Sequence, residues 1–275
     1  MNWGDADYSQ FGARVNTKLG IRLNDYKPDQ MIRRLRALGE KHGCKSFAEL
    51  AAQMDRNSDL LSQFLDHFTI NVTELYRNPE LFQYFEKSVL PELTKNCIGR
   101  PFEAWSAGCS YGAEAFTLAT ILQENISSGN WKIRGTDIDL TIIAKANSPK
   151  FNEQDMTHVP LDRKSKYFMT LDDKIWMPNM AVKRNISFSP HDLLKDRYGI
   201  KQYDLILCRN VVIYFNDDAK DRIFQGFYDA LRPGGYLFIG GTERLNDHKK
   251  IGFELSRPFF YKKPAEEPAL LRRAA

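Results

Sequence analysis

Apolar residues recur at helical spacing through roughly the first 85 positions of this chain. Phe11, Val15 and Leu19 stand four residues apart and are followed by Gly20, a pattern that predicts a helix ending at the glycine. The other signals are an apolar stripe between Pro28 and Gly43, the capping box Ser46-Phe-Ala-Glu49 and a stripe from Leu60 to Phe68. Residues 1–85 are therefore expected to form a small helical domain.

A segment with Pro91, Gly99 and Pro101 is the expected linker, and the pattern changes beyond it. Strand-like runs then alternate with helix-like runs, which is typical of a parallel sheet covered by helices on both faces. The strand-like runs are residues 102–107, 133–137, 203–208 and 235–240. A last run at Phe259-Phe-Tyr261 suggests an antiparallel pair that closes the sheet. Residues 86–275 are expected to form a doubly wound α/β domain.

Residues 151–189 interrupt this alternation. Three short runs, Ile175-Trp-Met, Ala181-Val-Lys and Ile186-Ser-Phe, have the composition of strands, and turn residues stand at Pro178-Asn and Arg184-Asn. We expect a small antiparallel β insertion here.

Composition changes this picture little. The chain has 275 residues, of which 43% are hydrophobic and 27% charged, as in ordinary globular proteins. The first residues do not resemble a targeting peptide and no apolar run is long enough to span a membrane, so we expect a cytoplasmic protein without membrane insertion. The four cysteines and five histidines lack metal-ligand spacing, which predicts no metal. A net charge of +4 does not favour a nucleic-acid partner.

The segment Trp105-Ser-Ala-Gly-Cys-Ser-Tyr-Gly-Ala-Glu114 is the strongest chemical signal. It follows the pattern strand, glycine turn, helix, in which Gly108 and Gly112 allow a ligand to approach the backbone. Neither a P-loop nor a dinucleotide motif is present, and Glu114 would repel a pyrophosphate. A carboxylate suits ribose hydroxyls and a cation instead, which points to S-adenosylmethionine. The alternative is an ordinary tight connection between a strand and a helix.

Acidic and amide side chains follow three further strand-like runs. Asp137 ends the second run, where doubly wound folds bind ribose hydroxyls, although an aspartate there can also cap a helix. Asp192 and Leu193 follow another run, and Arg209 and Asn210 follow the next. Since ligands of open α/β sheets bind beyond the carboxyl ends of the strands, we expect these residues near the cofactor, or else in caps and loops.

Four segments together resemble the CheR-type chemotaxis receptor methyltransferases in order and spacing. They are Asn71-Val-Thr-Glu-Leu-Tyr-Arg-Asn-Pro79, Trp105 to Glu114, Gly135-Thr-Asp137 and Cys208-Arg-Asn-Val-Val-Ile-Tyr-Phe215. The likeness covers nearly the whole chain. It implies methyl transfer from S-adenosylmethionine, with S-adenosylhomocysteine as product, to glutamates in the cytoplasmic helical region of chemotaxis receptors. The protein is then expected to act as a monomer.

The same resemblance implies roles for individual residues. The cofactor contacts would be Asn71, Thr73, Arg77, Glu114, Asp137, Asp192, Leu193, Arg209 and Asn210, and the glycine turn itself adds Gly108. Arg77 and Tyr214 would act on the substrate, with packing beside Phe215 as the alternative for Tyr214. The chain departs from the family pattern at Ala113, where an acid is usual, and at Leu75, where an aromatic is usual.

A basic run lies on the predicted second helix. Arg33, Arg34, Arg36 and Lys41 would face solvent if Met31, Leu35 and Leu38 face inward. Such runs commonly just solvate a helix, but a basic surface would also attract the glutamate-rich helices that this family methylates. We therefore expect Arg33, Arg34 and Arg36 to dock the receptor.

Two other functions remain open. A nucleic-acid methyltransferase would share the cofactor fold, but amino-group methylation usually requires an Asn/Asp-Pro-Pro-aromatic loop, and this chain has Arg209-Asn-Val-Val-Ile-Tyr214 at that place. A cofactor-binding sensor or interaction module without methyl transfer is the other alternative.

Overall fold

The chain divides into two compact units in the computed structural model, which describes residues 3–68, 72–126, 129–172 and 174–266. The first unit comprises Met1–Asn71 and Tyr214–Arg222, and the second comprises Val72–Ile213 and Ile223–Ala275. This division lies earlier in the chain than the boundary expected at residue 85. The reason is that Phe82, Phe85 and Leu90 are buried in the hydrophobic core of the second unit, so the proline-containing segment is no linker.

The first unit is helical, as its apolar spacing predicts. Its elements are α1 (Asp5–Leu19), the 3₁₀ turn η1 (Leu23–Asp25), α2 (Pro28–Lys41), α3 (Phe47–Arg56) and α4 (Ser58–Phe68). Gly20 ends α1 in the left-handed conformation, with φ of 70°, and donates its N–H to the Asn16 carbonyl. Ser46 caps α3 by accepting the Glu49 N–H at 3.1 Å. The aromatic rings of Phe11, Phe47 and Phe64 are buried between the helices.

A segment from late in the chain belongs to this helical unit. The Lys27 N–H donates to the Tyr214 carbonyl at 2.9 Å, and the Asn216 N–H donates to the Asp25 carbonyl at 2.9 Å. Arg222 also pairs with Asp25 at 2.6 Å. Residues 214–222 are thus fixed to the segment between η1 and α2.

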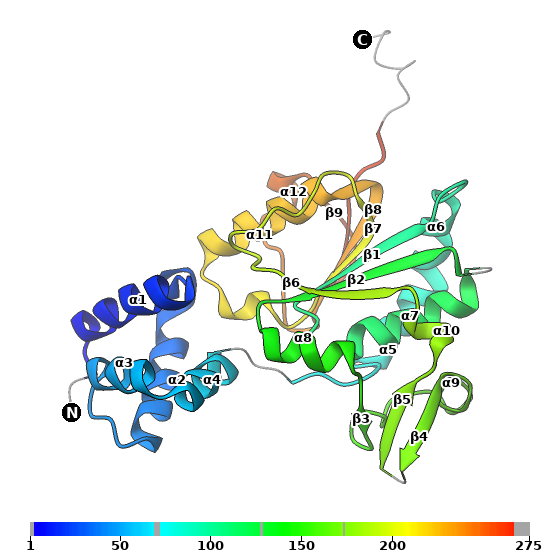
Figure 1. Cartoon of the computed structure of the whole chain (residues 1–275). Helices are drawn as coiled ribbons and strands as arrows, with labels where there is room; N and C mark the ends of the chain where they lie inside the picture. Colours follow the sequence, from blue (N-terminus) through cyan, green and yellow to red (C-terminus); the bar gives the residue numbers. More distant parts are fainter. Residues whose placement is uncertain (1–2, 69–71, 127–128, 173, 267–275) are drawn as a thin grey trace, which may run out of the picture. The chain divides into compact units, whose positions relative to one another are not determined.

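The second unit is built on a seven-stranded sheet (Figure 1), which confirms the predicted doubly wound α/β fold. Its strands are β1 (Phe102–Ala107), β2 (Trp131–Asp137), β6 (Ile186–Pro190), β7 (Tyr203–Cys208), β8 (Leu231–Ile239), β9 (Glu254–Arg257) and β10 (Phe260–Lys262). They are ordered β6-β2-β1-β7-β8-β10-β9. Neighbours from β6 to β8 are parallel, whereas β10 is antiparallel to both β8 and β9. The chain order reverses between β1 and β7, and ligands of such sheets bind at that point.

Helices cover both faces of the sheet. They are α5 (Pro79–Tyr84), the π-helical turn η2 (Phe85–Val89), α6 (Leu90–Lys95), α7 (Ala113–Asn125), α8 (Leu140–Asn147), α11 (Asp217–Ala230) and α12 (His248–Ile251). In Figure 1, α7 and α8 lie on one side of the sheet and α12 lies on the other. α7 is buried along most of its length, from Ala113 to Leu122, so the glycine turn that precedes it is anchored to the core.

The small β insertion is present, but two of its three expected strands were assigned wrongly. Its sheet is formed by β3 (Phe151–Asn152), β5 (Ile175–Pro178) and β4 (Phe168–Asp172), all antiparallel, with α9 (Leu161–Tyr167) beside it. Residues 181–183 lie in the helical turn α10 (Met180–Lys183), because the Asn179 side chain caps its N-terminus by accepting the Ala181 N–H. Residues 186–188 lie in β6, in the large sheet, because Gly135 leaves room there for the Phe188 ring.

Candidate functional site

The glycine turn between β1 and α7 is held against the end of β2. The N–H groups of Gly108 and Cys109 both donate to the Thr136 carbonyl at 2.8 Å. Gly108 has a φ of 77°, and a Cβ atom there would lie 2.4 Å from a methyl carbon of Val211. Only glycine therefore fits at this position, because the loop after β7 passes directly beside it.

Asp137 ends β2 with its carboxylate against this turn. Ser110 N–H donates to Oδ2 at 2.9 Å and Asp139 N–H donates to Oδ1 at 3.1 Å. Burial raises the pKa of Asp137, although the backbone hydrogen bonds oppose this. The helix cap, which was the alternative role for Asp137, belongs to Asp139, whose side chain accepts the N–H groups of Thr141 and Ile142 at the start of α8. Asp137 is thus not used as a helix cap, and a carboxylate oxygen can accept more than one hydrogen bond, so it can also accept from a ligand.

Glu114 lies in the first turn of α7 and is buried. Ser106 Oγ donates to its Oε1 at 2.6 Å, and Arg209 Nη1 lies 3.7 Å from its Oε2. Burial raises the pKa of Glu114, while the charge of Arg209 lowers it. Ser106 is a contact that sequence reasoning missed, because a serine inside a strand carries no distinctive signal.

Arg209 follows β7 and points toward the loop that carries Arg77. Its Nη2 donates to the Arg77 carbonyl at 2.7 Å and to Asn78 Oδ1 at 3.0 Å. The guanidinium carbon lies 4.8 Å from the ring centroids of both Phe82 and Phe238. Cation–π contacts with these two rings hold the Arg209 group in place.

Asn210 adopts a left-handed conformation, with φ of 60°. Its Oδ1 is buried and has no hydrogen-bond partner in the part of the chain that the structure describes. Buried acceptors are normally satisfied, so this oxygen is suited to a donor on a bound ligand.

Glu243 organises the loop after β7, and sequence reasoning missed it. Its Oε2 accepts the N–H groups of Gly240 and Asn210 at 2.7 and 2.8 Å, and its Oε1 accepts those of Val211 and Val212 at 3.0 Å each. The side chain is buried, and burial raises its pKa. No motif marks Glu243, because its partners are backbone groups, and three of them lie 31 to 33 residues earlier in the chain.

Asp192 and Leu193 follow β6. The His191 N–H donates to the Asp137 carbonyl at 2.9 Å, so this loop starts beside Asp137. The Asp192 carboxylate accepts the Leu194 N–H at 2.8 Å and lies 3.2 Å from Lys195 Nζ. Asp192 is thus partly occupied by its own loop.

The loop before α5 carries Thr73 and Arg77. Arg77 Nη1 donates to the Val72 carbonyl at 3.0 Å, and the Thr73 carbonyl accepts the hydroxyl of Tyr111 from the glycine turn. Asn71, expected at the cofactor, lies outside the described residues.

Tyr214 and the expected docking residues belong to the helical unit. Arg33 and Arg36 on α2 are exposed, and Arg36 pairs with Glu40 at 2.8 Å. Arg34 is half-buried, so its expected position on the solvent side was wrong. Burial lowers the pKa of Arg34, and the nearby Tyr214 opposes this. Position 34 flanks the buried stripe of α2, next to Leu35, which explains the difference.

These residues fit an adenosyl ligand. Asp137 offers an acceptor for a ribose diol, Asn210 Oδ1 offers one for an amino group, and Gly108 lets the loop that carries Asn210 pack against the glycine turn. Within the described residues, no group of three or more His, Cys, Asp or Glu side chains is arranged to hold a metal ion. None of the helices described combines the length and apolar character of a membrane span.

Comparison with known proteins agrees with this assignment. Residues 71–258 match the family model described as "CheR methyltransferase, SAM binding domain", and residues 6–69 match "CheR methyltransferase, all-alpha domain". The chain is 34% identical to a chemotaxis protein methyltransferase of Listeria innocua, over 94% of this chain and 97% of the relative. It is 29% identical to the chemotaxis protein methyltransferase Cher2 of Pseudomonas putida, over 91% and 96% of the two chains.

Proposed function

This chain belongs to the CheR methyltransferase family, and we propose that it methylates glutamate side chains of chemotaxis receptors through a site formed by the glycine turn, Asp137 and Arg77. S-adenosylmethionine supplies an electrophilic methyl group on a sulfonium when bound. Asp137 would hold the ribose and Asn210 would accept from an amino group. The observation that carries this proposal is the Asp137 carboxylate, which the backbone N–H groups of Ser110 and Asp139 fix at the end of β2, beside the glycine turn.

The chemistry needs no general base. A glutamate side chain has an ordinary pKa near 4.3, so its carboxylate is already ionised at neutral pH. The carboxylate oxygen forms a bond to the methyl carbon while the carbon–sulfur bond breaks, which gives a methyl ester and S-adenosylhomocysteine without proton transfer. The protein must then align three atoms and exclude water, and such positioning can contribute about 7–11 kcal/mol.

We assign this alignment to Arg77 and Tyr214. A guanidinium holds a carboxylate in a fixed plane, and a tyrosine hydroxyl can donate one further hydrogen bond. Arg77 is prepared for this task because its backbone carbonyl is held by Arg209 and its side chain is only partly engaged, through the Val72 carbonyl.

The receptor surface belongs to the proposal as well. Arg33 and Arg36 present exposed guanidinium groups on α2, which would attract the glutamate-rich helices of a receptor's cytoplasmic region. Because those receptor regions are cytoplasmic, we propose that the enzyme acts in the cytoplasm, and we propose further that it acts as a monomer.

Incubation with radiolabelled S-adenosylmethionine and receptor-containing membranes tests the function. We expect label on the receptor that mild base removes, as an ester requires, and none with Arg77→Ala. Tight cofactor binding without any transfer would instead support a sensor, and base-stable label would exclude glutamate esters.

A further inference from the structure

The loop that presents Arg77 is held in place by side chains from other elements. The Tyr76 N–H donates to Thr117 Oγ1 at 2.8 Å, and the Leu75 N–H donates to the Asp155 carbonyl at 3.2 Å. Tyr76 itself has a φ of 57°, a conformation that few residues other than glycine adopt. The backbone just before Arg77 is therefore strained and depends on its surroundings.

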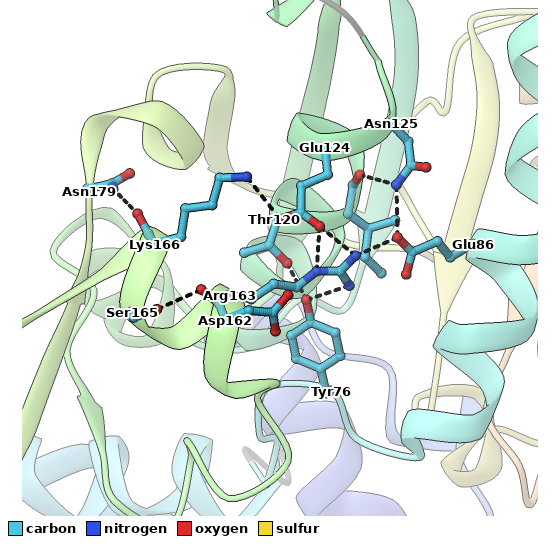
Figure 2. A network of polar contacts seen from close by, with 11 residues as sticks. Tyr76, Glu86, Thr120, Glu124, Asn125, Asp162, Arg163, Ser165, Lys166 and Asn179 are labelled. Carbon is cyan, nitrogen blue, oxygen red and sulfur yellow. Dashed lines mark hydrogen bonds and ion pairs between the residues drawn. The ribbon is translucent and has the colours of Figure 1, made fainter.

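The buried hydroxyl of Tyr76 belongs to a network of polar contacts, in which it binds Thr120 and Arg163 (Figure 2). Thr120 donates its own proton to the Thr117 carbonyl at 2.8 Å, so Tyr76 must be the donor in its hydrogen bond to Thr120 Oγ1. Burial raises the pKa of Tyr76 to about 12, so the hydroxyl keeps this proton at neutral pH. The lone pairs of the Tyr76 oxygen then face a cation.

That cation is Arg163, on α9 of the β insertion. Its Nη1 donates to the Tyr76 hydroxyl at 3.1 Å, its Nε to Glu124 at 2.8 Å and its Nη2 to Glu86 at 2.5 Å. Burial opposes the charge, but these partners outweigh it and hold the pKa of Arg163 above its ordinary value. Figure 2 shows the guanidinium between the two glutamates and the tyrosine, so each of its three nitrogens donates a hydrogen bond.

We propose that Arg163 is a positioning residue for methyl transfer: it fixes Tyr76 and thereby the backbone that presents Arg77. Arg163 lies in the insertion, Glu124 in α7 and Glu86 in η2, so the fork joins three elements around one hydroxyl. Arg209 holds the Arg77 carbonyl from the opposite side of the residue. Tyr76 and Arg209 together fix the backbone from which the Arg77 side chain extends, and a displacement of about 1 Å at a reacting group can cost on the order of 100-fold in rate.

This inference rests on the proposed function and gives the insertion a role in catalysis. Arg163 has no contact with Asp137 or Asn210 among the interactions of the described residues, so its loss should leave cofactor binding intact. A residue that served only stability would lower the amount of folded enzyme without changing the turnover of the folded fraction.

The test compares Arg163→Met, Arg163→Lys and Tyr76→Phe with Lys166→Met. Lys166 is the matched control because it also binds Glu124, at 3.3 Å, but is exposed and does not touch Tyr76. Each variant is assayed for kcat, for cofactor Kd by calorimetry and for amide hydrogen exchange in residues 72–78.

We expect Arg163→Met to lower kcat by about 10-fold to 100-fold with unchanged cofactor Kd, and Arg163→Lys to recover part of the loss. Tyr76→Phe should lower kcat as well. The double variant should have a kcat close to that of Arg163→Met alone, because both substitutions remove the same hydrogen bond between Arg163 and Tyr76. Exchange at 72–78 should quicken in Arg163→Met and not in Lys166→Met.

Unchanged kcat and unchanged exchange in a folded Arg163→Met enzyme would overturn the positioning role, as would additive losses in the double variant. The proposed function fails separately, if the wild-type enzyme transfers no methyl group. The exchange measurement needs no activity, so the two failures are distinguishable.

Discussion

The backbone N–H of Ser110 donates a 2.9 Å hydrogen bond to Oδ2 of Asp137, so the glycine turn and the end of β2 fix each other. Ser110 itself has a φ of 50°, which directs its amide toward the carboxylate. The protein's own hydrogen bonds thereby organise the edge of the sheet where we propose that the cofactor binds, and such preorganisation reduces the cost of binding.

Replacement of Asp137 should weaken the cofactor site. Asp137→Ala removes the proposed ribose acceptor and leaves two backbone N–H groups without their partner. We expect S-adenosylmethionine and S-adenosylhomocysteine each to lose about 1–3 kcal/mol of binding free energy by calorimetry. Asp192→Ala is a useful comparison because that carboxylate is partly occupied by its own loop, so its loss should be smaller. Unchanged affinity in folded Asp137→Ala would remove this residue from the site.

The sequence predicted that the glycine turn and Asp137 lie together because its signal is local. A glycine turn after one strand and an acid at the end of the next strand lie side by side whenever the two strands are parallel neighbours, as β1 and β2 are. Glu243 and Arg163 were not predictable in the same way, since each acts through partners distant in sequence. The prediction of a strand at Ala181-Val-Lys was wrong because these residues form a helical turn. Asn179 caps this turn, and apolar composition does not reveal it. Ile186-Ser-Phe was recognised as a strand but placed in the wrong sheet, because register depends on the space at Gly135.

Cofactor affinity should depend on pH through Asp137. Burial raises its pKa above the ordinary 3.8 in the free protein. Ribose hydroxyls that donate to the carboxylate favour its ionised form, so binding lowers this pKa and releases protons. Affinity should therefore rise as pH increases through the raised pKa, and level off above it. Calorimetry between about pH 5 and about pH 8, in buffers of different ionisation enthalpy, measures the number of protons released on binding. Asp137→Asn should release fewer protons than the wild type. Proton uptake by the wild type would contradict the role of Asp137 as the ribose acceptor.

The same pKa shift has the opposite consequence for stability without cofactor. An acid whose folded pKa is raised contributes stability that is fully present below its unfolded pKa. That contribution is lost as pH rises through the folded pKa. Bound cofactor should reverse this trend for Asp137.

Arg77 and Tyr214 should affect turnover more than cofactor binding. Arg77→Ala should lower kcat by at least about 100-fold, because the substrate carboxylate loses its fixed plane. Arg77→Lys should recover little, since one ammonium does not reproduce a planar fork. Tyr214→Phe removes only a hydroxyl and should give a smaller loss. Methyl transfer at saturating cofactor is the measurement, with thermal melting to confirm folding. Near-normal turnover in Arg77→Ala would exclude the mechanism.

Receptor docking should depend on the exposed arginines of α2. Arg33→Glu combined with Arg36→Glu should raise the receptor KM by about 10-fold, the equivalent of about 1.4 kcal/mol, and weaken its salt dependence. Cofactor affinity should stay unchanged. The control is Lys45→Glu combined with Arg56→Glu, which makes the same charge change at exposed positions of this unit outside α2. Equal KM values for the two double variants would show that total charge, and no docking surface on α2, governs the encounter.

Glu243 should stabilise both the fold and the cofactor site. Its carboxylate accepts four backbone N–H groups, and an amide in its place would turn an NH₂ group toward two of those donors. We expect Glu243→Gln to lower the free energy of unfolding by about 1–3 kcal/mol for each donor left unpaired. Cofactor affinity should fall too, because Asn210 and the Val211 side chain beside Gly108 lie on the loop that Glu243 holds.

Urea denaturation with and without S-adenosylhomocysteine measures both effects of the Glu243 change. Glu254→Gln, the same substitution at an exposed position in β9, is the control and should unfold like the wild type. If Glu243→Gln and Glu254→Gln unfolded at the same urea concentration, the four hydrogen bonds would contribute nothing beyond what water supplies to those amides. The loop after β7 would then be held by its other contacts, among them the hydrogen bonds of Arg209 and the buried side chain of Val212.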